Sequence, residues 1–81
     1  MKVSLKLFAV AKELVGRDEL TIEVSHGATL GELREALAQQ FPSLGPILPH
    51  AMWAVDTAYA RDEVVLNENS EVAIIPPVSG G

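Results

Sequence analysis

The stretch that decides the fold is Val72-Ala73-Ile74-Ile75-Pro76-Pro77-Val78-Ser79-Gly80-Gly81. Its first four residues are apolar and mostly β-branched, which predicts a buried strand. Two consecutive prolines cannot donate hydrogen bonds to a sheet, so we expect the strand to stop at Ile75. The sequence therefore predicts a folded domain over residues 1–75 and a flexible C-terminal tail over residues 76–81.

The tip of this tail is narrow, because Gly80 and Gly81 have no Cβ. Such a backbone can enter a slot that excludes other residues and present its terminal carboxylate there. At about 3.3 Å per residue, the six residues of the tail can reach roughly 20 Å from the domain. A frayed end or a cloning remnant is the alternative interpretation of a glycine-rich terminus. The paired prolines favour a functional tail.

Composition limits the kind of protein. With 81 residues and no cysteine, the chain predicts one small domain without a disulfide, a thiolate metal site or a cysteine nucleophile. A formal net charge of −5 argues against nucleic-acid binding and suits a basic partner surface. Lys6 and Lys12 leave too short an apolar run for an export signal, and three prolines interrupt the uncharged residues 36–55, so we expect a cytoplasmic protein without a membrane span.

The first half of the chain predicts two strands and two helices. Residues 2–8 and 19–24 alternate between apolar and polar side chains, as half-buried strands do, and residues 9–15 indicate a short helical turn that ends at Gly16. Thr29 with Glu32 makes a capping box for the main helix. Its core face lies at helical spacing: Leu30, Leu33, Leu37 and Phe41.

The second half predicts a proline-rich loop over residues 42–50 and further strands. Residues 52–55 form a short strand that is apolar on both faces, in which Trp53 is expected to belong to the core or cover an edge. After a turn at residues 56–58 the strand pattern resumes only at residues 63–66. A turn at residues 67–70 then leads into the last strand.

This order of elements favours an α+β domain of the β-grasp type, with a mixed sheet of about four to five strands packed on one main helix. No short hairpin joins the first and last strands, so they can pair in parallel as central neighbours. That pairing would fix the point at which the tail leaves the sheet.

Few residues inside the chain indicate chemistry. No phosphate-binding glycine pattern is present, so the protein is not expected to handle ATP itself. His26 and His50 have no companion at metal-ligand spacing, and Ser79 has no evident base. The carboxylate of Gly81 is the remaining candidate. Because free carboxylates are poor electrophiles, it would need adenylation before it could accept sulfur or an amine, which makes the chain a carrier.

The chain resembles the small, sulfur-carrying subunit of molybdopterin synthase (the MoaD family), a ubiquitin-like β-grasp family. The resemblance is strongest over residues 71–81, with a second marker in Leu7-Phe8-Ala9 followed by Lys12-Glu13 and Gly16. The chain departs from the family pattern at Asp56, where Asn is usual, and at Asn69-Ser70, where Gly-Asp is common.

The resemblance implies a reaction cycle. An adenylating enzyme uses ATP to activate Gly81, a sulfur donor converts it to a thiocarboxylate, and the tail enters the large synthase subunit. The sulfur then goes to the cyclic pyranopterin precursor, which builds the dithiolene that holds molybdenum or tungsten. No cofactor is bound by the chain itself, and two small and two large subunits assemble.

The resemblance also implies roles for other residues. Gly80 and Ser79 would thread the pocket of the large subunit, and Phe8 would pack in the subunit interface. The residues that lead into the pocket would be Pro76, Pro77 and Val78.

Three alternatives remain open at this level. A ubiquitin-like modifier would join the same activated Gly81 to lysines of target proteins. A sulfur carrier for thiamine synthesis or tRNA thiolation would use the same tail. A plain binding module would not need the tail at all.

Overall fold

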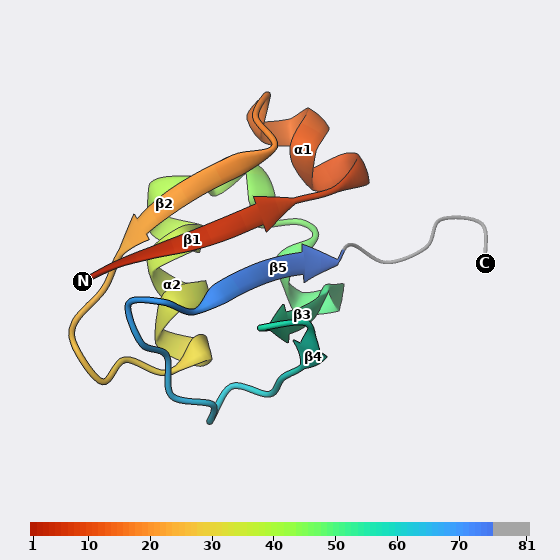
Figure 1. Ribbon diagram of the computed structural model, residues 1–81. Coiled ribbons are helices and arrows are strands. Elements are labelled where there is room, and N and C mark those ends of the chain that lie inside the picture. Colours follow the sequence, from red (N-terminus) through yellow and green to blue (C-terminus); the bar gives the residue numbers. More distant parts are fainter. Residues whose placement is uncertain (76–81) are drawn as a thin grey trace.

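One mixed sheet with a long helix against one face forms the domain, and the computed structural model describes residues 1–75 (Figure 1). The predicted tail at residues 76–81 lies outside the described residues. The elements in chain order are β1 (Lys2–Leu7), α1 (Ala9–Val15), β2 (Glu19–Glu23), α2 (Leu30–Gln40), the 3-10 turns η1 (Pro42–Leu44) and η2 (Leu48–His50), β3 (Met52–Val55), β4 (Ala58–Tyr59) and β5 (Glu71–Ile75).

The sheet has five strands in the order β2-β1-β5-β3-β4. Its central pair, β1 and β5, is parallel, with Leu5 opposite Val72 and Leu7 opposite Ile74. The flanking pairs β1–β2 and β3–β5 are antiparallel. The predicted α+β β-grasp fold and the parallel pairing of the first and last strands are therefore confirmed.

The core lies between the sheet and α2, which runs behind the sheet in Figure 1. Alternate residues of the central strands and one stripe of the helix are fully buried, as the sequence periodicity predicted. The side chains at most 1% exposed in these elements are Val3, Leu5, Leu7, Ile22, Leu30, Leu33, Leu37, Val72 and Ile74. Trp53 joins this cluster at 5% exposure, which confirms that it belongs to the core.

The N-terminus of α2 is capped in two ways. Thr29 Oγ1 accepts a hydrogen bond from the backbone N–H of Glu32 at 3.3 Å, and the Glu32 carboxylate accepts one from the Thr29 N–H at 3.2 Å, which confirms the capping box. The next free N–H groups, those of Leu30 and Gly31, donate to the carbonyls of Val64 and Asp62. Residues 60–66 therefore form a strap that ties the sheet edge to the helix.

This strap corrects the interpretation of residues 63–66, where the sequence pattern indicated a return to strand. Val65 makes only an isolated bridge with Thr29. The carbonyls just before it in the segment accept hydrogen bonds from the first N–H groups of α2 and so are not available to a neighbouring strand. The two-residue strand β4 was not expected from the sequence. Phe41, predicted to continue the core stripe, does pack against the core, but as the C-cap of α2 it is only partly buried.

The two turns at which the chain departs from the family pattern are well bonded. Asp56 has a positive φ of 50° and clamps β5, since its N–H donates to the Glu71 carbonyl at 2.8 Å and its Oδ1 accepts from the Glu71 N–H at 2.9 Å. Ser70 is buried, and its Oγ accepts from the Asn67 N–H at 3.0 Å. Both turns fix where β5 begins.

Candidate functional site

The predicted site residues separate into two groups. Phe8 is described by the structure, whereas the other six lie outside the described residues: Pro76, Pro77, Val78, Ser79, Gly80 and Gly81. The structure therefore defines the surface from which the tail starts. That surface surrounds Ile75, the last residue of β5.

Ile75 lies between two exposed hydrophobic side chains. On one side, Ile75 pairs with Met52 of β3. On the other side, Ile74 pairs with Leu7 of the parallel strand β1, so the residue after Leu7, Phe8, lies beside Ile75. Phe8 is 49% exposed and Met52 is 54% exposed. Because side chains alternate along a strand, these three residues form a row on the face of the sheet opposite α2.

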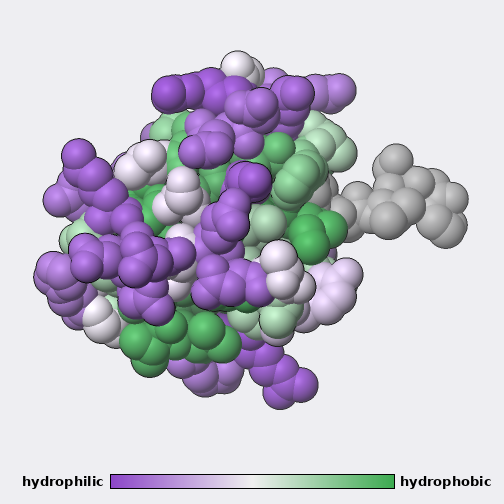
Figure 2. Space-filling view, in the orientation of Figure 1, coloured by the Kyte–Doolittle hydropathy of each residue, from purple (hydrophilic) through white to green (hydrophobic). Residues whose placement is uncertain are grey.

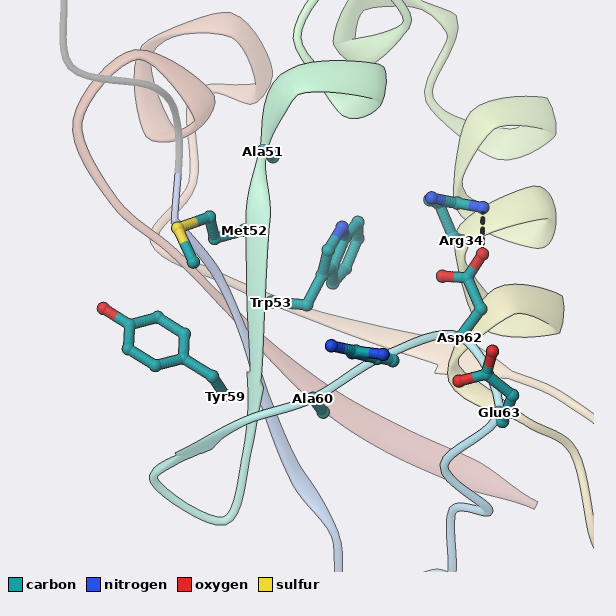
Figure 3. A pocket seen from close by; sticks show the side chains of 9 residues that line it. Arg34, Ala51, Met52, Trp53, Tyr59, Ala60, Asp62 and Glu63 are labelled. Atoms are coloured by element: carbon teal, nitrogen blue, oxygen red, sulfur yellow. Dashed lines mark hydrogen bonds and ion pairs between the residues drawn. The ribbon is translucent and has the colours of Figure 1, made fainter.

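A second row lies beside the first. Ala73 pairs with Ala54, and Ala54 pairs with Tyr59, which is 71% exposed. We call the two rows together the exit face, and its members are Phe8, Met52, Ala54, Tyr59, Ala73 and Ile75. Figure 2 shows hydrophobic surface at this end of the molecule, and Figure 3 shows Met52 and Tyr59 on one side of β3 with Trp53 on the other.

The sequence located Phe8 on this face but missed Met52 and Tyr59. Residues 52–55 form a strand that is apolar on both faces, as predicted, but that pattern did not show which face is buried: Met52 is exposed and Trp53 is buried. The size difference between Met52 and Trp53 could have predicted which face is buried, since the larger of the two side chains, the Trp53 indole, occupies the core. Tyr59 could not be placed because a two-residue strand has no measurable period.

Local backbone geometry holds Phe8 in place. It is the N-cap of α1 with an extended backbone, and the next residue, Ala9, has a positive φ of 49°. The Phe8 carbonyl accepts a hydrogen bond from the Ala11 N–H at 3.1 Å. A left-handed conformation is costly for alanine, so this sharp turn is maintained by the surrounding fold and keeps the phenyl ring outside the core.

Charged and polar residues border the exit face. Lys6 Nζ lies 3.1 Å from the Glu71 carboxylate, and both side chains are about half exposed. A shallow hollow of about 280 Å³ adjoins this ion pair and also contacts Phe8 and Thr57. The face is thus an apolar centre with a polar rim, the usual composition of a protein–protein contact.

Within residues 1–75 the structure contains no cluster of three potential metal-ligating side chains. No helix in this part of the chain is both long and apolar enough to span a membrane.

A mixed five-stranded sheet that holds one long helix, with its first and last strands parallel at the centre, defines a ubiquitin-like β-grasp protein. The chain belongs to the ThiS family, whose family model matches residues 5–81. It is 35% identical over 81 residues to the molybdopterin synthase sulfur carrier subunit of Arabidopsis thaliana, covering 100% of this chain and 84% of the relative.

Two solved structures show the same fold. SAMP1, the small archaeal modifier protein 1 of Haloferax volcanii, superposes with a TM-score of 0.89 at 27% identity and covers 100% of both chains. The putative molybdopterin converting factor subunit 1 of Pyrococcus furiosus gives a TM-score of 0.84 at 27% identity, covering 96% of this chain and 99% of that one.

Proposed function

We propose that this chain is the sulfur carrier subunit of a molybdopterin synthase and that Gly81 carries the sulfur. The observation that carries the proposal is the family match, which runs through residue 81 and so includes the Gly-Gly end. Full-length similarity to a curated sulfur carrier subunit supports it. In this proposal residues 1–75 are the scaffold and residues 76–81 are the part that partners act on.

Loading Gly81 with sulfur takes two steps. A carboxylate oxygen attacks the α-phosphorus of ATP on the adenylating partner and displaces pyrophosphate, which leaves an acyl-adenylate. Sulfur delivered by a donor at the oxidation level of sulfide then attacks the carbonyl carbon and displaces AMP. In the proposed transfer, the thiocarboxylate sulfur forms a bond to the cyclic pyranopterin precursor and displaces an oxygen substituent, and water then cleaves the Gly81 carbon–sulfur bond, which leaves the sulfur on the product and restores the carboxylate. ATP belongs to the partner, and the chain binds no cofactor of its own.

The exit face supplies the recognition surface for the large synthase subunit. Phe8, Met52 and Tyr59 are large, exposed side chains grouped around the end of β5, and such side chains supply most of the binding energy in protein interfaces. A large subunit that binds this face would receive the tail at the same time. Ser79 and Gly80 then thread its pocket, and the residues that lead in are Pro76, Pro77 and Val78.

Reconstitution tests the proposal. The thiocarboxylated chain, the large subunit and the cyclic precursor should together yield the dithiolene product, with two copies of each subunit in the complex. A chain that lacks Gly80 and Gly81 should yield none while keeping the circular dichroism spectrum of the full chain. Full product formation by the truncated chain would overturn the proposal.

A second candidate function is protein modification, because SAMP1 is similar over its whole length. Here the activated Gly81 forms an isopeptide bond to a lysine amine in place of the bond to sulfur. Incubation with the adenylating enzyme and ATP, with and without a sulfur donor, separates the two functions: lysine conjugates seen as a ladder on a gel support modification. A sulfur carrier for thiamine synthesis or tRNA thiolation is distinguished by replacing the cyclic pyranopterin precursor in the transfer assay with the sulfur acceptor of that pathway.

A further inference from the structure

A pocket of about 490 Å³ adjoins the exit face at the edge of β3. Two residues of the exit face, Met52 and Tyr59, line this pocket, so the pocket and the face share a border. Two arginines also line it, Arg34 from α2 and Arg61 from the strap. A protein that covers the exit face at Met52 and Tyr59 therefore also reaches the arginines.

The pocket is open because the sheet edge ends early at this place. β4 pairs only with Ala54 and Val55, and the next contact along β3 is the hydrogen bond from the Ala60 N–H to the Trp53 carbonyl. Within residues 1–75, no strand pairs with Met52 on the side away from β5. A side chain of a protein bound on the exit face can therefore enter the pocket around this edge.

The two arginines differ in their partners. Arg34 donates to the Asp62 carboxylate at 2.5 Å, and Figure 3 shows this pair joining α2 to the strap. Arg61 is exposed and forms no ion pair with any residue of 1–75, although Glu63 lines the same pocket. In the described part of the chain, the guanidinium of Arg61 is thus available to a charged group from outside.

The backbone on both sides of Arg61 is held in place. On one side is the hydrogen bond from the Ala60 N–H to β3, at 2.9 Å, and on the other the Asp62 carbonyl accepts from the Gly31 N–H at 3.1 Å. The Arg61 carbonyl itself accepts from the Val64 N–H at 3.1 Å. Because the backbone is already ordered, binding has to order only the Arg61 side chain, which lowers the entropy cost of using it as an anchor.

The chemistry of Arg61 defines the group that it can bind. A guanidinium presents planar donors that match a carboxylate in two parallel hydrogen bonds. A partner that covered Arg61 without supplying an acceptor would strip water from an uncompensated charge, which is costly. We infer that the protein that binds the exit face places the carboxylate of an Asp or Glu side chain in this pocket, against Arg61.

This inference rests on the proposed function, because the partner that it describes is the large synthase subunit. The chain has a formal net charge of −5, so the partner surface that faces it is expected to be basic. A carboxylate within that surface is attracted to Arg61 and repelled by the acidic side chains of this chain. The pair therefore fixes the orientation in which the large subunit binds, while the apolar side chains of the exit face supply affinity.

Titration calorimetry of the full chain with the large subunit tests the inference. R61Q removes the charge and should weaken binding by at least about tenfold. The matched control is R17Q, at an exposed arginine that does not line the pocket, and it should bind as the unaltered chain does. Both variants should keep the melting temperature of the unaltered chain, because both side chains are exposed. A rise in salt concentration should weaken the unaltered chain more than R61Q.

Charge reversal identifies the group opposite Arg61. R61E should bind more weakly than R61Q, because two carboxylates then face each other. Replacing one Asp or Glu of the large subunit with Lys should restore the binding of R61E and weaken that of the unaltered chain. Equal binding of R61Q and the unaltered chain, or an R61E variant that no such replacement restores, would overturn the inference alone. An unaltered chain that does not bind the large subunit would overturn the proposed function and this inference with it.

Discussion

Met52 and Ile75 pair across the antiparallel β3–β5 ladder, so the last described residue of the chain lies beside an exposed thioether. On the other side of Ile75 lies Phe8, the residue that directly follows β1. The end of β5 is therefore enclosed by hydrophobic side chains from strands that are distant in sequence. We expect a partner that binds the residues after Ile75 to contact these side chains as well, which would join recognition of the tail to recognition of the domain.

The first prediction concerns this contact. Replacing Phe8 or Met52 with alanine should weaken binding to the large synthase subunit by at least about tenfold, because each removes an exposed anchor near the centre of the proposed interface. Isothermal titration calorimetry gives the affinities. The matched control is Val65→Ala, at a valine that is 62% exposed but bridges Thr29 at the start of α2. Equal affinities for all three variants would remove the exit face from the interface.

The second prediction separates the tail from the scaffold. Gly81→Ala should strongly reduce sulfur transfer, because a Cβ is added where the proposed partner slot admits only backbone. The melting temperature should stay that of the unaltered chain, because we expect the tail to lie outside the core that the described residues form. Calorimetric melting alongside the transfer assay checks both statements. A variant that unfolds would show that the end of the chain supports the core.

The third prediction concerns a strained turn. Thr57 has a positive φ of 71°, a conformation that costs a β-branched residue roughly 1–2 kcal/mol. Thr57→Gly should therefore raise the free energy of unfolding by about 0.5–1 kcal/mol after the entropy of the unfolded glycine is subtracted. Urea denaturation measures the change. Thr21→Gly, in the middle of β2, should instead lower stability, and a loss of stability at both sites would mean that Thr57 is not strained.

The fourth prediction concerns the cap of α2. Thr29→Ala removes the acceptor of the Glu32 N–H and should lower the free energy of unfolding by about 1 kcal/mol. Thr29→Ser keeps a hydroxyl and should lower it much less. The same urea experiment compares the two. Equal losses would show that the methyl group of Thr29, and not its hydrogen bond, stabilises the helix.

The elements that follow a simple period were predictable from the sequence. Leu5 and Leu7 in β1, and Leu33 and Leu37 in α2, are buried as their spacing indicated, because burial of one face determines both elements. Gly16 ends α1 in the left-handed conformation expected of a helix C-cap, with a φ of 81°. Local rules and the tertiary structure agree at these positions.

Elements that depend on distant contacts were not predictable. The strap at residues 60–66 is shaped by N–H groups of Leu30 and Gly31, about thirty residues earlier in the chain. The exit face combines Phe8, Met52 and Tyr59 from three separate parts of the sequence, and only Phe8 was identified, as a misplaced aromatic residue.

The central claim is that the carboxylate of Gly81 is loaded with sulfur by other proteins while the domain acts as the scaffold. The most direct test is the intact mass of the chain after incubation with the adenylating enzyme, ATP and a sulfur donor, followed by fragmentation to locate the change. We predict that one oxygen is replaced by sulfur and that the replacement lies at Gly81. An unchanged mass under conditions that load an established sulfur carrier, or sulfur located at any other residue, would contradict it.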